Sequence, residues 1–177
     1  MNFPSKLVEN AVEQLSSLPG IGRKSALRLV LHMLKNDKIT VEQFGDSFIQ
    51  LINRINYCSK CYSISDSTLC EVCDNQNRDA KIICVVEDIR VMMAIENTMQ
   101  YKGVYHILGG LISPIDGVGP SEIRVDELIN RVKNDNVTEI IFALSTTMEG
   151  DTTNYYLFRR LREYGIKISS IARGIAI

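Results

Sequence analysis

Two cysteine pairs, Cys58-x2-Cys61 and Cys70-x2-Cys73, constrain the fold of this 177-residue chain more than any other feature. Two thiolates of one pair can reach a single ion from a tight turn, and the gap between the pairs lets both turns close a tetrahedron with Zn–S distances of about 2.3 Å. Sulfur would then occupy every ligand position, so we expect one structural Zn²⁺. A redox CxxC pair or disulfides remain the alternative. We expect Cys84, in an apolar run, to be a small core residue.

The chain before the first cysteine is predicted to be entirely helical. Apolar residues recur at helical spacing in Ser5–Ser17 and from about Arg23 to Leu34. Thr40 and Gln43 form a capping box that opens a third helix. Residues 1–56 are therefore expected to form a helical bundle.

The stretch LPGIGRKSALRLVLHML joins the first two of these helices. Gly20 and Gly22 permit the positive φ of a tight hairpin, and the second helix then begins with unpaired amides beside Arg23 and Lys24. Arg28 follows one turn later on the same face. Amides and cations together predict an anion site, and the expected anion is a phosphate of DNA. An ordinary packing corner with solvated basic residues remains the alternative.

Beyond the cysteines, short β-branched runs alternate with amphipathic helical patterns. The runs are KIICVV, VYHIL, EIIFAL and IKISSI, and the helices are expected at Asp88–Tyr101, around Val125–Lys133 and at Thr152–Tyr164, with Gly165 as a stop. This alternation indicates right-handed βαβ units and a parallel, Rossmann-like sheet flanked by helices. The expected fold class is α/β in several parts: a helical region at 1–56, a zinc motif at 57–79 and the sheet domain at 80–177.

Acidic residues follow two of the predicted strands. Glu87 and Asp88 come directly after the first strand, and Glu149 and Asp151 follow the third. The carboxyl ends of adjacent parallel strands converge on the crevice where such sheets bind ligands, so these acids could hold Mg²⁺. They could equally cap the helices that follow, and Asp88 and Asp151 are well placed for that.

Overall charge says little about function. The net charge of −1 and isoelectric point near 6.1 neither indicate nor exclude a nucleic-acid partner, because binding depends on local charge. The first residues lack the apolar run of a signal peptide, and no segment approaches the ~18 apolar residues of a spanning helix. We therefore expect a cytoplasmic chain with reduced cysteines and no membrane partner.

The order of these parts resembles the RecR family of bacterial recombination mediators, which joins a helix-hairpin-helix, a four-cysteine zinc motif and a Toprim domain. The segments CSKCYSISDSTLCEVCDNQNR and YHILGGLISPIDGVGPSEI are similar to that family's own motifs, and the resemblance covers essentially the whole chain. In the family the hairpin contacts DNA. By resemblance this role falls on Lys24 and Arg28, with Arg23 a weaker candidate.

The resemblance implies a DNA-repair role without catalysis. Members of the family form ring-like dimers or tetramers, act with RecO and RecF at single-strand gaps and help to load RecA, which implies a cytoplasmic protein associated with the nucleoid. They usually continue past ARGIAI, whereas this chain stops at Ile177. Toprim domains of topoisomerases and primases carry a glutamate and an Asp-x-Asp, but the second motif here reads Glu149-Gly150-Asp151. We expect the acidic edge to be a partner surface. The alternative function is a small nuclease with Glu87, Glu149 and Asp151 around Mg²⁺.

Overall fold

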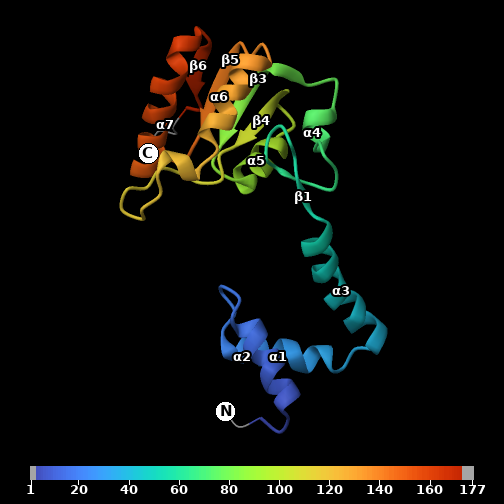
Figure 1. Cartoon of the computed structure of the whole chain (residues 1–177). Coiled ribbons are helices and arrows are strands. Elements are labelled where there is room, and N and C mark those ends of the chain that lie inside the picture. The colour runs from blue at the N-terminus through green and yellow to red at the C-terminus, as the bar shows by residue number, and fades with distance from the viewer. Residues whose placement is uncertain (1–2, 173–177) are drawn as a thin grey trace. The chain divides into compact units, whose positions relative to one another are not determined.

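The computed structural model describes residues 3–172, and the chain divides into two compact units, residues 1–54 and 55–177 (Figure 1). Within the described range, no helix has the length and apolar character needed to cross a membrane. The boundaries at 56/57 and 79/80 stay predictions. The end of the predicted Toprim range, residues 173–177, lies outside the described residues.

The first unit consists of helices α1 (Lys6–Ser16), α2 (Arg23–Met33) and α3 (Lys38–Arg54). Helix α1 begins at Ser5, whose hydroxyl accepts a hydrogen bond from the amide of Leu7 at 3.2 Å. Helices α1 and α2 pack on each other around Val12, Ala26 and Val30, which are almost fully buried. Their helical spacing brings these apolar residues to one face of each helix.

The hairpin between α1 and α2 uses its two glycines differently. Gly20 has a φ of +80°, the left-handed conformation that the sequence predicts. For Gly22 the expectation of positive φ is wrong: its φ is −77° and its ψ 158°, ordinary extended backbone. Gly22 is the N-cap of α2 and has no side chain to accept from the first amides. The start of α2 therefore keeps its open donors.

Helix α3 begins earlier than the predicted capping box. The carboxylate of Asp37 accepts from the amide of Thr40 at 2.9 Å and from its hydroxyl at 2.7 Å, so Asp37 takes the capping position. Thr40 thereby lies inside the first turn. None of the residues of α3 is buried within the described unit.

The second unit consists of one small sheet, one larger sheet and the helices between their strands. Its elements are β1 (Asn56–Tyr57), β2 (Ile64–Ser65), α4 (Glu71–Asp74), β3 (Asp79–Val86), α5 (Ile89–Glu96), β4 (Gly103–Ile107), η1 (Pro120–Glu122), α6 (Val125–Asn134), β5 (Glu139–Ala143), α7 (Met148–Leu161), η2 (Arg162–Tyr164) and β6 (Lys167–Ser170). Strands β1 and β2 pair antiparallel, and the other four form a parallel sheet in the order β4-β3-β5-β6. The predicted α/β class is confirmed.

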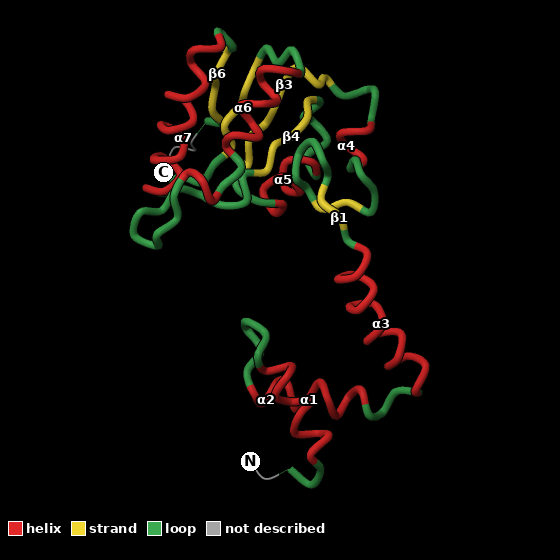
Figure 2. The backbone as a smooth tube through the Cα atoms, in the orientation of Figure 1, coloured by secondary structure: helices red, strands yellow, loops and turns green. Residues whose placement is uncertain are grey.

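Helices cover both faces of the parallel sheet, which Figure 2 shows as yellow strands between red helices. On β3, Ile83 and Val85 belong to the core shared with α6 and α7. Cys84 and Val86 belong to the core on the opposite face, beside Met92 of α5. This alternation follows the two-residue period of a strand and explains why KIICVV is apolar throughout. Cys84 is a buried core residue, as expected.

The sheet order places a topological switch point at the carboxyl ends of β3 and β5. From β3 the chain passes to β4 on one side, and it then returns past β3 to add β5 and β6 on the other. Connections that leave neighbouring strands in opposite directions open a crevice between them, and such crevices bind ligands in open α/β sheets.

The two helices around this crevice differ from their predicted ranges. Helix α5 ends at Glu96, short of the predicted Tyr101, and Met99 follows with a φ of +57°. Helix α7 begins at Met148, four residues before the predicted Thr152, because the hydroxyl of Thr147 accepts from the amide of Gly150 at 3.2 Å. Glu149 and Asp151 therefore lie in the first turn of α7.

Candidate functional site

The four paired cysteines form one compact cluster in the second unit. Cys58 and Cys61 flank the turn after β1, and Cys70 and Cys73 flank the start of α4. Their four ligand atoms lie within 4.8 Å of one another, and the sulfurs of Cys61 and Cys70 are 3.4 Å apart. A tetrahedral site with Zn–S bonds of about 2.3 Å has S···S edges of about 3.8 Å. The cluster therefore has the size that a metal site requires.

The sulfur chemistry of the cluster also suits a metal. All five cysteines are free, and 3.4 Å is far beyond a disulfide bond of about 2.05 Å. Hydrogen bonds from Cys61 and Cys73 lower the pKa of Cys70, and the same contacts raise the pKa of Cys61 and Cys73, so the cluster favours one thiolate, at Cys70, the form that binds metal. Cys58, Cys61 and Cys70 are buried, which leaves no open ligand position on their side of the cluster.

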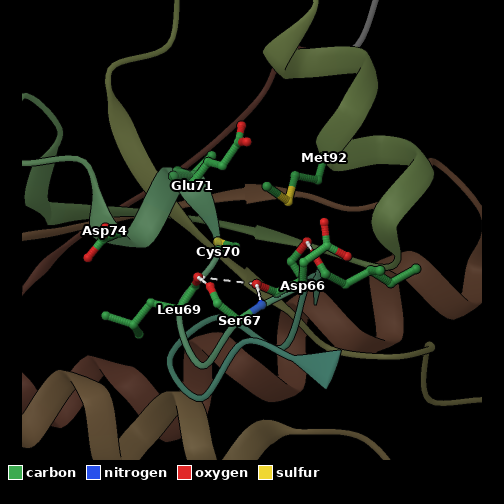
Figure 3. Close-up of a pocket in the computed structure, with 11 residues that line it drawn as sticks. Asp66, Ser67, Leu69, Cys70, Glu71, Asp74 and Met92 are labelled. Atoms are coloured by element: carbon green, nitrogen blue, oxygen red, sulfur yellow. Dashed lines mark hydrogen bonds between the residues drawn. The ribbon is translucent and has the colours of Figure 1, made fainter. Parts of the chain in front are cut away.

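A serine-rich turn holds the loop between the two cysteine pairs (Figure 3). The hydroxyls of Ser65 and Ser67 both donate to the carbonyl of Leu69, at 3.2 and 2.6 Å, and the amide of Ser67 donates to Ser65 Oγ. A cavity of about 380 Å³ lies beside this turn, with Cys70 and Met92 in its lining. These local bonds explain how eight residues between the pairs fold back to place Cys70 against Cys61.

The first cysteine turn is docked on the edge strand β4. The carbonyl of Cys61 accepts from the amide of Ile107 at 2.9 Å. Tyr62, in the left-handed conformation with a φ of +64°, stacks edge-on against His106 at 5.6 Å between ring centroids. The guanidinium of Arg124 lies 5.0 Å from the Tyr62 ring centroid. Burial lowers the pKa of His106 to about 3, so its ring is neutral at pH 7, and Nε2 donates to the Arg124 carbonyl at 2.7 Å.

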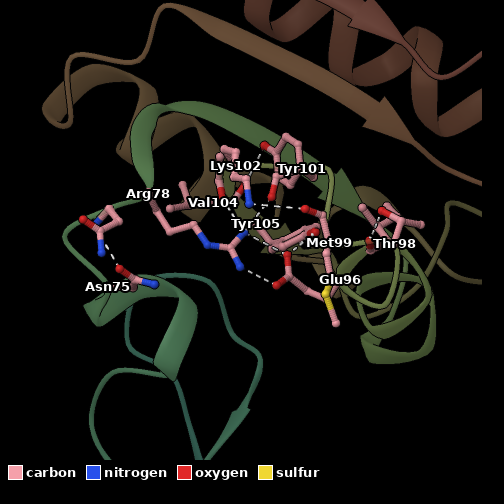
Figure 4. Close-up of polar contacts among 12 residues, drawn as sticks. Asn75, Arg78, Glu96, Thr98, Met99, Tyr101, Lys102, Val104 and Tyr105 are labelled. Carbon is pink, nitrogen blue, oxygen red and sulfur yellow. Dashed lines mark hydrogen bonds and ion pairs between the residues drawn. The ribbon is translucent and has the colours of Figure 1, made fainter.

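A second link ties the end of the cysteine segment to the sheet domain (Figure 4). Arg78 donates to the Glu96 carboxylate through both terminal nitrogens and to the carbonyl of Tyr101 at 3.0 Å. Tyr105 donates to the same carboxylate at 2.6 Å. Burial alone would raise the pKa of Glu96, but the Arg78 and Tyr105 hydrogen bonds outweigh it and hold the pKa below its usual value.

The crevice at the ends of β3 and β5 contains two of the predicted acids. Glu87 and Glu149 both line a cavity of about 660 Å³, formed with the loop after β4. Asp116 and Glu122 line it too, although the sequence pattern did not single them out. The lining includes four carboxylates and no lysine or arginine, and the guanidinium of Arg124 lies beside Gly109 at its edge, so carboxylates outnumber cations at the crevice. Both residues lie in the segment YHILGGLISPIDGVGPSEI, whose similarity to the family's motif was the sequence signal for this loop.

Asp88 and Asp151, unlike Glu87 and Glu149, do not line the crevice. Asp88 caps α5 by accepting from the amides of Arg90 at 2.9 Å and Val91 at 3.2 Å, as the helix-capping alternative expected. Asp151 is not in the lining of the cavity and is exposed in the first turn of α7. The capping expectation for Asp151 is wrong, because Thr147 takes that position.

In the helical unit, the predicted basic residues separate into two groups. Lys24 and Arg28 line the same shallow groove of about 410 Å³ on α2, together with Leu27, Leu31, His32 and Lys35. Arg23 instead turns toward α1, where its guanidinium is 3.9 Å from the Glu13 carboxylate and 5.7 Å from the centroid of the Phe3 ring. The groove therefore contains three exposed cations, Lys24, Arg28 and Lys35, and it lies on the helix whose first amides, after Gly22, have no side-chain cap.

Comparison with known proteins identifies the family. The RecR helix-hairpin-helix family matches residues 8–51, and the Toprim domain family matches residues 81–172. Recombination protein RecR of Bacteroides thetaiotaomicron is 55% identical over 175 residues, 99% of this chain and 85% of that protein. RecR of Flavobacterium johnsoniae is 54% identical over 177 residues, 100% of this chain and 86% of that protein. The chain belongs to the RecR family. The corresponding protein of Amoebophilus asiaticus is 52% identical over 177 residues, 100% of this chain and 88% of that protein.

RecR membership accounts for the order of the parts along the chain. The hairpin between α1 and α2 lies within the matched RecR helix-hairpin-helix, and the acidic crevice lies within the matched Toprim domain. The four-cysteine cluster occupies the segment between the two matches. The predicted family and architecture are thus confirmed.

Proposed function

We propose that this RecR-family chain is a DNA-binding recombination mediator in DNA repair, which acts in the cytoplasm at the nucleoid and has no catalysis of its own. The observation that carries the proposal is the α2 groove, where Lys24 and Arg28 stand beside the open amides after Gly22. Such a site binds phosphates and positions the protein without reading bases.

A double substitution tests the DNA contact. Lys24→Ala with Arg28→Ala should weaken binding to single-stranded and duplex DNA of any sequence and flatten the slope of log affinity against log salt by up to about two. Lys6→Ala with Lys38→Ala is the matched control, because it removes two exposed cations from the same unit outside the groove. Fluorescence anisotropy at several salt concentrations measures both. Wild-type affinity and slope in the groove variant would mean that the hairpin is a packing corner.

We further propose that the cysteine cluster holds one Zn²⁺ with a structural role. Support comes from four sulfurs within 4.8 Å and from their docking on β4 through Cys61. Zinc would join α4 and the β1–β2 turn into one body, and the protein's own contacts through Tyr62 and Arg78 would fix that body to the sheet.

The acidic crevice is proposed as the surface for a basic protein partner, RecO, with RecF acting in the same process to promote RecA loading. Four carboxylates without a cation in the lining suit a positively charged surface. Glu149→Lys should therefore weaken RecO binding, measured by titration calorimetry, and leave metal content unchanged.

One observation favours a second candidate function, a Mg²⁺-dependent nuclease. Glu87 and Glu149 share a cavity at a switch point, and oxygen ligands suit Mg²⁺. An assay with gapped and duplex DNA in Mg²⁺ discriminates between the two. Cleavage that disappears in Glu87→Gln would establish the nuclease, whereas the mediator predicts intact DNA.

Homo-oligomerisation, a ring-like dimer or tetramer, is proposed on the basis of α3. Its Phe44 and Phe48 pack edge-to-face at 5.1 Å and yet are 47% and 55% exposed, and Ile52 is 77% exposed. An exposed apolar helix face of this kind marks an association surface. Phe48→Glu should lower the solution mass measured by light scattering at concentrations where the wild type associates.

A further inference from the structure

The outer face of α7 exposes two aromatic rings that the fold does not use. Tyr155 is 65% exposed and Phe158 46% exposed. Leu157 and Leu161, on the opposite side of the helix, are fully buried in the main core and attach α7 to the sheet. The rings could be replaced by polar side chains without loss to this core, so packing does not explain them.

Two arginines stand on the same face. Tyr155, Phe158 and Arg159 are spaced at i, i+3 and i+4 in α7. Arg162, at i+7, is the C-cap of α7 and the first residue of η2, and its backbone is still helical, so all four residues lie on one side of the helix. The guanidinium of Arg159 lies 6.0 Å from the centroid of the Tyr155 ring, within reach of a cation–π contact. We call Tyr155, Phe158, Arg159 and Arg162 the α7 face.

Among the described residues, the two arginines of the α7 face differ from their neighbour Arg160 in having no salt bridge, and the acid on the same side of the helix, Asp151, lies one turn before Tyr155. The neighbouring Arg160 is engaged, because it donates to the Tyr156 hydroxyl at 2.8 Å and pairs with Asp126 at 3.0 Å. Arg159 and Arg162, by contrast, have no carboxylate within ion-pair distance in the described part of the chain. The face therefore offers flat rings and free positive charge together.

We propose that the α7 face is a second DNA-binding surface and that its ligand is single-stranded DNA. Unpaired bases stack on exposed aromatic rings with little regard to sequence, and adjacent arginines bind the phosphates. Duplex DNA hides the faces of its bases inside the helix, so the rings select the single strand. This surface belongs to the Toprim unit, whereas the proposed hairpin contact belongs to the helical unit.

A tryptophan reporter tests the stacking directly. The chain contains no tryptophan, so Tyr155→Trp places a single tryptophan, which can be excited apart from the tyrosines, on the α7 face. Titration of the full chain with oligo(dT) of about 20 nucleotides should quench its emission, because a stacked base quenches indole. Tyr57→Trp is the control, since Tyr57 is 62% exposed on β1 and outside the face. Its emission should stay unchanged.

A second set of variants separates this surface from the hairpin. Quenching of Tyr155→Trp should persist when Lys24→Ala and Arg28→Ala are added, at a higher oligonucleotide concentration. Addition of Arg159→Ala with Arg162→Ala should then weaken binding about five- to tenfold and lower the single-strand salt slope by up to about 1.4. Circular dichroism and metal content should not change, because all four side chains are exposed.

The proposal is wrong if oligo(dT) leaves Tyr155→Trp unquenched, or if duplex DNA quenches it equally. Loss of self-association in Tyr155→Ala with Phe158→Ala, with unchanged single-strand affinity, would assign the face to a protein contact and also overturn it. If Lys24→Ala with Arg28→Ala leaves DNA affinity unchanged, the hairpin proposal is wrong but the α7 prediction still holds, because the emission of Tyr155→Trp reports on the α7 face alone.

Discussion

Arg78→Ala should destabilise the second unit more than the loss of any exposed ion pair. Arg78 is the last residue before β3, and its side chain is only 17% exposed. It satisfies the Glu96 carboxylate, itself 25% exposed, and donates to the carbonyls of Tyr101 and Gly103. Truncation leaves a half-buried carboxylate with Tyr105 as its remaining donor and leaves two carbonyls without this donor.

The magnitude follows from the burial of the pair. Removal of one partner from a fully buried ion pair costs roughly 3–5 kcal/mol. The remaining exposure of Arg78 and Glu96 lets water solvate the orphaned groups in part, so we expect a loss of about 2–3 kcal/mol. For a unit of this size, that lowers the melting temperature by roughly 8–12 °C.

The assay is thermal unfolding followed by circular dichroism and scanning calorimetry, with Arg90→Ala as the matched control. Arg90, like Arg78, pairs with a carboxylate, that of Asp88, but the Arg90 side chain is 84% exposed. Exposed ion pairs contribute little because water and salt screen them, so Arg90→Ala should lower the melting temperature by much less than Arg78→Ala. Equal effects of Arg78→Ala and Arg90→Ala would refute the inferred role of the Arg78 network.

The pH dependence has a definite sign. The folded-state pKa of Glu96 is depressed, so the contribution of the pair is present above the unfolded pKa of about 4.3 and is lost as pH falls through the lower folded value. The stability difference between wild type and Arg78→Ala should be constant from about pH 6 to 8 and should shrink below about pH 4.

Three further outcomes are expected. Freshly purified, reduced protein should contain one zinc per chain, and chelation should speed hydrogen exchange in residues 57–79; well under one equivalent of zinc would contradict the assignment. Gly150→Ala should lower stability by about 1–3 kcal/mol, since a Cβ there would lie 1.9 Å from the Ser145 carbonyl oxygen; unchanged chemical denaturation would show that this loop moves freely. In His106→Asn the free energy of unfolding should fall less steeply than in the wild type between about pH 6.5 and 5. His106 is buried and neutral in the folded protein, so the unfolded chain takes up its proton first and acid destabilises the wild type; equal slopes in the two proteins would contradict this.

Local patterns predicted the elements of this fold, and tertiary structure decided their ends. The strands were predictable because their β-branched runs alternate between two cores, as Ile83 and Cys84 do. The start of α7 was not, because Thr147 and Thr152 are equally good caps in sequence. Thr147 is selected by the point where β5 ends and by the close packing of Gly150 against Ser145. Asp37 and Thr40 are likewise both good caps in sequence, and in the structure Asp37 takes the capping position of α3.

The candidate sites also differ in how far the sequence could predict them. The cysteine cluster was predictable because two CxxC turns carry their own geometry. Asp116 and Glu122 were not, because a tertiary fold of the loop brings them to the crevice: Ser113 and Val118 exchange backbone hydrogen bonds at 3.0 and 2.9 Å, and Asp116 accepts from Ser113 Oγ at 2.6 Å. No residue spacing in the sequence predicts that this loop closes on itself.

The near-neutral charge of the chain conceals surfaces of opposite sign, which is why composition could not indicate a partner. The groove on α2 gathers Lys24 and Arg28, while the crevice of the Toprim unit gathers four carboxylates without a cation. A phosphate backbone is attracted to the first and repelled by the second. We therefore expect DNA to prefer the groove and a basic protein to prefer the crevice. Charge reversal in the groove should consequently weaken DNA binding and spare the protein partner, whereas reversal in the crevice should weaken binding of the protein partner and spare DNA.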